Sequence, residues 1–172
     1  MGQTTTGINA QLGAGGTITG RVTDESGNGI NNVSVQIRNT DNYTIIWTGT
    51  DSSGNYTARG VPGGNWKVFF QASAYTNYIC EFYNDKMAVE NADLVNVTPG
   101  QTVPNIDAQL AEGGSISGRV TDISGNGIAN AIIGVFDITN NMWLNRGGSV
   151  LTDENGYYSF TGIPEGNHKV SF

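Results

Sequence analysis

The chain has 172 residues, a net charge of -7 and only 13% charged residues. An acidic chain repels phosphate backbones and offers no basic patch to an anionic bilayer, so we expect no nucleic acid partner and no membrane surface. No apolar run approaches the roughly 20 residues that span a bilayer, so we expect no membrane insertion.

A long stretch of the chain occurs twice. Residues 15–24 return as residues 113–122 with nearly the same sequence. Self-similarity of this kind is typical of an array of modules. The alignment predicts a closing strand of a preceding module, or a donor strand, in residues 1–12. It predicts a first module in residues 13–110 and a truncated second module in residues 111–172.

Short segments of the first module alternate between apolar and polar residues, which is typical of half-buried strands. Strands are predicted over residues 17–23, 33–38 and 44–48, with Gln36 facing outward. Turns are expected where Gly, Asn and Asp cluster after the first and third strands.

The later part of the first module continues this pattern. Trp66, Val68 and Phe70 alternate with Lys67 and Phe69, which predicts that the first three face the core. We expect further strands over residues 56–58, 79–83, 96–98 and 106–110, and one helical turn over residues 86–92. About seven short strands with frequent turns predict an antiparallel β-sandwich, and the short linker of residues 111–114 predicts a semi-rigid rod.

The ordered motifs resemble the carboxypeptidase regulatory-like domain. They are Gly-x-Ile-x-Gly-x-Val-x-Asp, a Ser-Gly-Asn-Gly turn, Thr-Asp-x-x-Gly-x-Tyr and a Pro-x-Gly-x-x-x-Val hairpin. They occupy residues 16–24 with 50–68, and 114–122 with 152–170. The resemblance implies an all-β fold of tandem transthyretin-like (prealbumin-like) seven-stranded Greek-key β-sandwiches, related to the collagen-adhesin B-type repeats. It also implies a secreted or cell-surface protein.

The resemblance implies no catalysis. We therefore expect a non-catalytic structural or adhesive module, such as a stalk, a spacer or a filament-forming unit. The alternative is a carbohydrate-binding accessory module of a secreted hydrolase. The residues argue in the same direction, because Cys80 and His168 are the only cysteine and histidine and lie in different modules. They offer no nucleophile–base pair and no zinc-ligand set.

Acidic turns are the first candidate ligand sites. The pattern Asp-x-Ser-x-Asn begins at residues 24 and 122 and places oxygen atoms at alternate positions, loosely as in a calcium loop. Each turn offers few carboxylates for an ion that takes six to eight oxygens, so ordinary turn chemistry explains the pattern and we expect no cofactor. Calcium remains the alternative, with these candidate ligands: Asp24, Asn28, Asp122, Asn126 and Asp153.

Two tryptophans are the second candidate. Trp47 and Trp143 lie in the region where the two modules differ most, and exposed indole rings would offer stacking faces to a polysaccharide. The alternative is that both rings pack against the protein. Trp66 is in phase with core residues, so we expect it to be buried.

The third candidate is an assembly of copies of the chain or of neighbouring modules. The first residues align with the end of the first module, and the second module lacks counterparts of the strands expected over 79–83 and 106–110. A spare strand of one chain would complete the second module of the next, head to tail, and would grow a filament unless a ring closes. The alternative is that the sequence is a piece of a longer array. The donating residues would be Ile8, Ala10 and Leu12.

Overall fold

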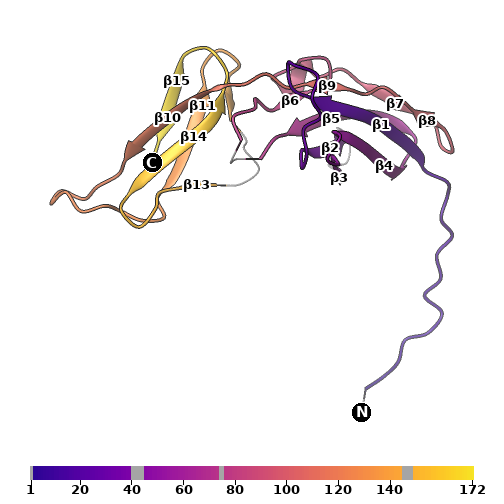
Figure 1. The fold of residues 1–172 in the computed structure, drawn as a ribbon. Coiled ribbons are helices and arrows are strands. Elements are labelled where there is room, and N and C mark those ends of the chain that lie inside the picture. The colour runs from indigo at the N-terminus through magenta and orange to yellow at the C-terminus, as the bar shows by residue number, and fades with distance from the viewer. Residues whose placement is uncertain (1, 40–44, 74–75, 145–148) are drawn as a thin grey trace.

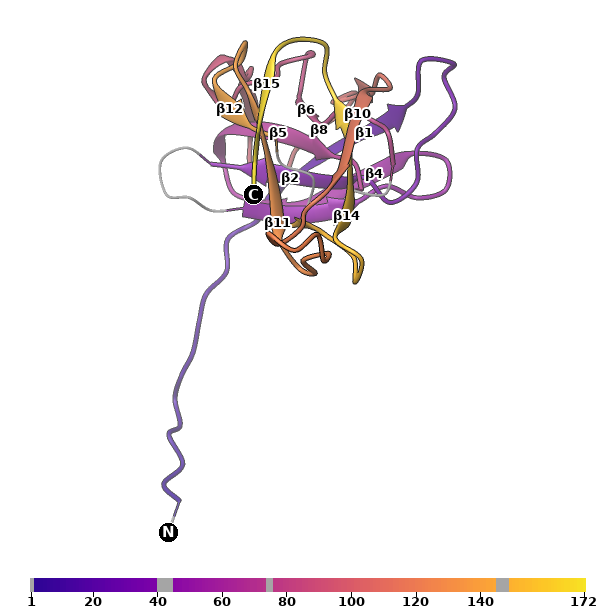
Figure 2. The same cartoon turned by 90° about the vertical axis from the view of Figure 1, so that its left-hand side faces the viewer.

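The computed structural model describes residues 2–39, 45–73, 76–144 and 149–172. The described chain is built almost entirely from β-strands, which form two modules that lie end to end (Figure 1). The strands of the second module cross those of the first in the view of Figure 2. Residues 2–14 leave the first module as an extended tail.

The first module is a sandwich of two sheets. In one sheet the order is β4-β1-β8, and β9 pairs with β1 beyond β8. These strands are β1 (Gly16–Thr23), β4 (Asn55–Val61), β8 (Thr102–Val103) and β9 (Ala108–Gln109). The order of the other sheet is β3-β2-β5-β6, and β7 pairs with β5 next to β6. Its strands are β2 (Ser34–Arg38), β3 (Ile45–Gly49), β5 (Gly64–Gln71), β6 (Glu81–Phe82) and β7 (Val95–Val97). The expected sandwich is confirmed, and Thr44 lies outside the described residues.

The core lies between these sheets and is made by the residues that alternation assigns to it. Trp66, Val68 and Phe70 on β5 are buried, and the Trp66 indole N–H donates to the Pro62 carbonyl at 2.9 Å. The expected helical turn is a 3-10 turn, η1 (Val89–Asn91).

The closing strand differs from the antiparallel expectation, because β8 and β9 run parallel to β1. The chain passes from β7 in one sheet to β8 in the other, and this crossing sets the direction in which β8 and β9 run along β1. Ile106 and Leu110 are buried there. The hydroxyl of Tyr56 donates to the Ile106 carbonyl at 2.6 Å, which ties the returning segment to β4.

The outer face of the β3-β2-β5 sheet also differs from expectation. Gln36 faces away from the core as predicted, yet it is only 1% exposed, and its amide donates to the Gln71 side-chain oxygen at 2.6 Å. Phe69, Phe82 and Ala92 form a second apolar cluster on that side. Outward-facing residues are therefore buried because other parts of the chain cover them.

The second module repeats the arrangement of β1 to β5, with β12 and β13 together in the place of β3. Its strands are β10 (Gly114–Arg119), β11 (Ile132–Asp137), β12 (Met142–Trp143), β13 (Val150–Leu151), β14 (Tyr157–Ile163) and β15 (His168–Ser171). β10 pairs with β14, and β11 pairs with β12 and β13 on one edge and β15 on the other. The four buried residues of its core are separate from the first core: Ile133, Val135, Phe160 and Ile163. Within the described ranges, β6 to β9 have no counterpart in this module.

A buried threonine fixes the same turn in both modules. The Thr50 hydroxyl donates to the Ile30 carbonyl at 2.6 Å and accepts the Val33 amide at 2.9 Å. Thr152 makes the equivalent bonds in the second module. The turn that follows packs closely under β1, since a β-carbon added to Gly54, whose φ is +81°, would lie 2.2 Å from a backbone oxygen.

We predict that Thr50→Val destabilises the chain, because it leaves a buried amide and a buried carbonyl without their shared partner. The free energy of unfolding should fall by about 1–3 kcal/mol, measured by urea denaturation. Thr57→Val, at an exposed position on β4, is the control and should change it by less than about 0.5 kcal/mol. Equal effects of the two substitutions would contradict this role for the hydroxyl.

Candidate functional site

The junction between the modules is held by hydrogen bonds from the loop before β6. The amide of Gly113 in the linker donates to the Asn77 carbonyl at 2.7 Å, and the Ile79 amide donates to the Ala111 carbonyl at 2.9 Å. The Thr161 hydroxyl on β14 reaches this loop and donates to the Thr76 carbonyl at 2.8 Å. One loop therefore holds both the linker and a strand of the second module.

Apolar side chains of both modules face each other beside these bonds. They surround one small hollow, and its walls include Phe69, Ile79, Cys80 and Met87 from the first module and Met142, Leu144 and Pro164 from the second. The second module thus covers part of the outer face of the β2-β5 sheet. Phe69 is buried although alternation assigns it to the outer face, because Phe82 and Ala92 of its own module pack with it and the second module closes the hollow beside it.

A groove of about 190 Å³ continues from this contact, with Arg38 and Trp143 among its lining residues. The Arg38 guanidinium lies 4.7 Å from the centre of the Phe69 ring and 5.6 Å from that of Phe82. It also donates two hydrogen bonds to the Gln36 side-chain oxygen. Burial lowers the pKa of Arg38, but a guanidinium keeps its proton in proteins. Its positive charge therefore lies at a groove that could take an anionic or hydroxyl-rich ligand.

Trp143 lies on β12 at the rim of this groove and is 57% exposed. Its ring packs edge-on against Phe136, with centroids 5.2 Å apart. The ring lies over β11 at Gly134, where an added β-carbon would approach it to 2.9 Å. One face of the ring is thus supported while more than half of the residue stays open to solvent.

Trp47 lies on β3, opposite Gln36 of β2, and is 60% exposed. Ile45, on the same face, is 41% exposed. Both tryptophans singled out in the sequence are therefore surface residues rather than core residues.

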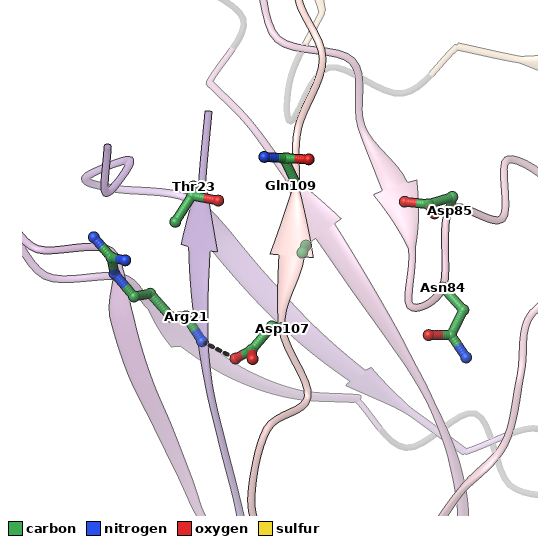
Figure 3. A pocket seen from close by; sticks show the side chains of 7 residues that line it. Arg21, Thr23, Asn84, Asp85, Asp107 and Gln109 are labelled. Atoms are coloured by element: carbon green, nitrogen blue, oxygen red, sulfur yellow. Dashed lines mark hydrogen bonds between the residues drawn. The ribbon is translucent and has the colours of Figure 1, made fainter. Parts of the chain in front are cut away.

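A second groove, of about 320 Å³, crosses the first module at β1 and β9 (Figure 3). Arg21 and Asp107 lie on one wall, where the Arg21 amide donates to a carboxylate oxygen of Asp107 at 2.7 Å. Asn84 and Asp85 lie across from them. The Arg21 guanidinium is bonded to the Ser53 and Gly27 carbonyls, so its charge stabilises turns.

Glu81 on β6 is the acid that the fold perturbs most. It is 8% exposed, and its Oε1 atom has no hydrogen-bond partner among the described residues. Burial, and secondarily the nearby charge of Asp85, raise its pKa to about 8. A perturbed acid is a common mark of a functional site. Catalysis would also need a base or nucleophile beside it, and among the described residues Asp85 is the charged group that shifts its pKa.

The turn aspartates use their oxygens within the turns. Asp24 Oδ1 accepts the amides of Ser26 and Asn28, and Oδ2 accepts the Asn28 side-chain amide at 3.0 Å. The side-chain bond from Asn28, with its backbone bond next, lowers the pKa of Asp24. The Asp122–Asn126 pair repeats this arrangement, and Asp153 Oδ1 accepts two backbone amides. These bonds favour turn chemistry, and calcium binding at these residues stays a prediction.

The described residues contain no group of three or more His, Cys, Asp and Glu side chains that could hold a metal ion. Cys80 is half-buried, and its thiol lies 3.8 Å from the Ala72 carbonyl. His168 lies on β15 of the other module. In the described part of the chain, no helix is long and apolar enough to cross a membrane.

The residues proposed as strand donors lie in the extended tail, where Ile8 is 84% and Leu12 is 90% exposed. Ala10 is exposed between them.

The Arg38 groove is the feature that the sequence did not reveal. Its signal was present in Phe69 and Phe82, since phenylalanine on a supposed outer face indicates that something covers that face.

Comparisons with known proteins agree with this architecture. The sequence model of the carboxypeptidase regulatory-like domain matches residues 17–111 and 115–172. Serine-aspartate repeat-containing protein F of Staphylococcus epidermidis is 27% identical over 164 residues, which are 88% of this chain and 10% of that protein. Serine-aspartate repeat-containing protein D of Staphylococcus aureus is 28% identical over 162 residues, which are 87% of this chain and 12% of that protein. The chain thus spans about a tenth of the length of these relatives.

Two solved structures are also similar over most of the chain. A streptococcal ancillary pilin is 14% identical with a TM-score of 0.42, and the match covers 91% of this chain and 53% of the pilin. A putative carbohydrate binding protein from Bacteroides uniformis is 13% identical with a TM-score of 0.41, and the match covers 86% of this chain and 79% of that protein.

We predict that Glu81→Gln removes a pH dependence of stability. Because the folded-state pKa of Glu81 is raised from 4.5 to about 8, its contribution is fully present below pH 4.5 and is lost as the pH rises to about 8. The variant should match the parent near pH 4 and exceed it by on the order of 3–5 kcal/mol near pH 9.

Urea denaturation across this pH range measures the difference. Glu25→Gln, in an exposed turn, is the control and should follow the parent curve. A constant offset between Glu81→Gln and the parent at all pH values would show that folding does not shift the pKa of Glu81.

Proposed function

The chain belongs to the carboxypeptidase regulatory-like domain family, and we propose that it is a non-catalytic structural unit of an extracellular or cell-surface protein. In this role it serves as a stalk or spacer within an array of similar modules. The observation that carries the proposal is the junction, where hydrogen bonds and an apolar contact join consecutive modules. A stalk needs such joints because free hinges would let it collapse.

The linker supports this role by its length and its bonding. Only residues 110–113 separate β9 from β10. Tyr78, in the loop before β6, forms a β-bridge with Glu112 of this linker. Such a connection transmits orientation from one module to the next. Two long relatives match this chain over about a tenth of their own length, so a similar module is one part of a longer protein there.

We predict that Met142→Lys loosens the junction, because it places a charge against Phe69 and beside Arg38. Small-angle X-ray scattering should then show a broader distribution of distances between the modules than in the parent. Ile123→Lys, in a fully exposed turn, is the control and should leave the distribution unchanged.

The stalk proposal fails if the parent chain itself samples a broad range of inter-module distances. If both variants keep the narrow distribution, the apolar contact does not set the orientation, and the hydrogen bonds from residues 76–79 alone must hold it.

A carbohydrate-binding role is the second candidate, and the exposed rings of Trp47 and Trp143 favour it. Planar sugar faces stack on exposed aromatic rings, and the Arg38 groove beside Trp143 adds hydrogen-bond donors. This role fits an accessory module beside a secreted hydrolase.

If this second role holds, Trp143→Ala should weaken retention on an insoluble polysaccharide at least about tenfold, with a smaller loss for Trp47→Ala. Tyr157→Ala is the control, since Tyr157 is 54% exposed and lies under Arg119 on the second module. A glycan array with no binding by the parent chain would leave the structural role alone.

A further inference from the structure

The outer face of the β2-β5 sheet carries two positive charges next to each other. Arg38 of β2 and Lys67 of β5 are opposite each other in the register of the sheet, so both side chains leave the same face. The chain has 8 Lys and Arg residues against 15 Asp and Glu residues, so such a pair is uncommon in it. Like charges at opposite positions of neighbouring strands repel each other, and an anion beside them would relieve that repulsion.

No carboxylate neutralises either charge within the described part of the chain. Arg38 donates from Nε and Nη2 to the side-chain oxygen of Gln36. The ammonium group of Lys67 donates to the Val89 carbonyl. Both acceptors are neutral oxygens, although positive groups that are partly buried are usually paired with an acid. The two charges are therefore held in position without being neutralised.

The guanidinium of Arg38 is oriented by its surroundings. Gln36, which accepts its two hydrogen bonds, is buried and is fixed in turn by the bond from its amide to the Gln71 side chain at 2.6 Å. The ring of Phe69, with its centre 4.7 Å away, supports the guanidinium. A guanidinium has five N–H groups. The bonds to Gln36 use the edge of Nε and Nη2, so the fork at the end of the group, between Nη1 and Nη2, is left for a ligand.

Trp143 of the second module faces the same groove. The groove has a volume of about 190 Å³, and its lining includes Arg38, Glu90 and Trp143. The edge-on contact with Phe136 holds the indole ring, while Trp143 as a whole is 57% exposed. Pockets that enclose drug-sized ligands start at roughly 300 Å³. This smaller groove fits one ring of a longer ligand.

The lining selects a ligand that combines a carboxylate with a flat apolar face. The free fork of Arg38 matches the two oxygens of a carboxylate. The open indole ring of Trp143 matches the apolar face of a pyranose ring. A uronic acid carries both groups in one sugar residue. The exposed carboxylate of Glu90 accepts hydrogen bonds from sugar hydroxyls, and it repels ligands with more charge, such as phosphate esters.

An acidic peptide matches only half of this lining. The carboxylate of an aspartate or glutamate side chain would pair with Arg38 in the same way. Its short apolar stem would leave most of the Trp143 ring uncovered. The exposed indole therefore favours the sugar over the peptide.

We propose that the groove between Arg38 and Trp143 binds one uronic acid residue of an acidic polysaccharide, with the carboxylate on Arg38 and the sugar ring on Trp143. Lys67 adds positive charge beside the carboxylate. This inference rests on the carbohydrate-binding role proposed above, and it adds the class of sugar and the residue that recognises its charge. Each module supplies one wall, so the site also requires the junction that holds the modules together.

A titration followed by heteronuclear NMR tests the proposal on the whole chain. Trigalacturonate should shift the indole N–H signal of Trp143 and the Nε–H signal of Arg38. Its methyl ester has the same rings without the charges, and it should bind at least about tenfold more weakly because it loses a charge-assisted pair. Added salt should weaken the binding of trigalacturonate more than that of the ester.

Three variants separate the two walls. Arg38→Lys keeps the charge but loses the fork, and it should weaken the binding of trigalacturonate at least about tenfold. Trp143→Ala, at an exposed position, should weaken both ligands and serves as the second test if Arg38→Lys does not fold. Trp47→Ala is the matched control, since Trp47 is exposed to a similar extent outside the groove, and it should bind as the parent does.

The outcomes distinguish this inference from the proposals on which it rests. Equal binding of trigalacturonate and its ester would overturn the choice of an acidic sugar and keep the carbohydrate-binding role. No binding of either ligand would overturn both, while the stalk role would still depend on the scattering experiment. A capped triglutamate peptide that binds as tightly as trigalacturonate would show that the sugar ring adds nothing, and it would overturn the proposal in favour of an acidic peptide.

Discussion

A β-strand has two edges, and the donors and acceptors on each edge need partners once they are buried. In the first module β1 meets this need with β4 on one edge and residues 102–110 on the other. The returning segment also delivers Ile106 and Leu110 to the core and accepts the Tyr56 hydroxyl. The closure of the first core therefore depends on a parallel pairing between two ends of the module.

The position of the second module follows from that pairing. Because the closing strand ends beside Thr23, the linker begins at a fixed place, and the loop of residues 76–79 bonds to it. The second module then lies beside part of the outer face of the β2-β5 sheet, where it closes the hollow next to Phe69 and lines the groove around Arg38. The hydrogen-bonded joint and the partly desolvated arginine are two results of one arrangement.

The two modules place similar sequences in different environments. Most charged and polar groups of the turns are used internally, as in the bonds that Asp24 and Arg21 make with backbone atoms. The surface open to interaction includes the exposed rings of Trp47 and Trp143. This distribution suits a protein that binds or assembles more than one that performs chemistry.

The sequence by itself determined the two modules, most of the strands and the inward residues of β1, β2 and β5, because a period of two and the chemistry of turns are local properties. It also placed Trp66 in the core and left Trp47 and Trp143 as surface candidates. Only the tertiary structure decided that the closing strand is parallel, that Gln36 and Phe69 are buried on an outer face, and that Glu81 has a raised pKa. These features depend on what distant segments cover, and the alternation along one strand carries no information about its neighbours in space.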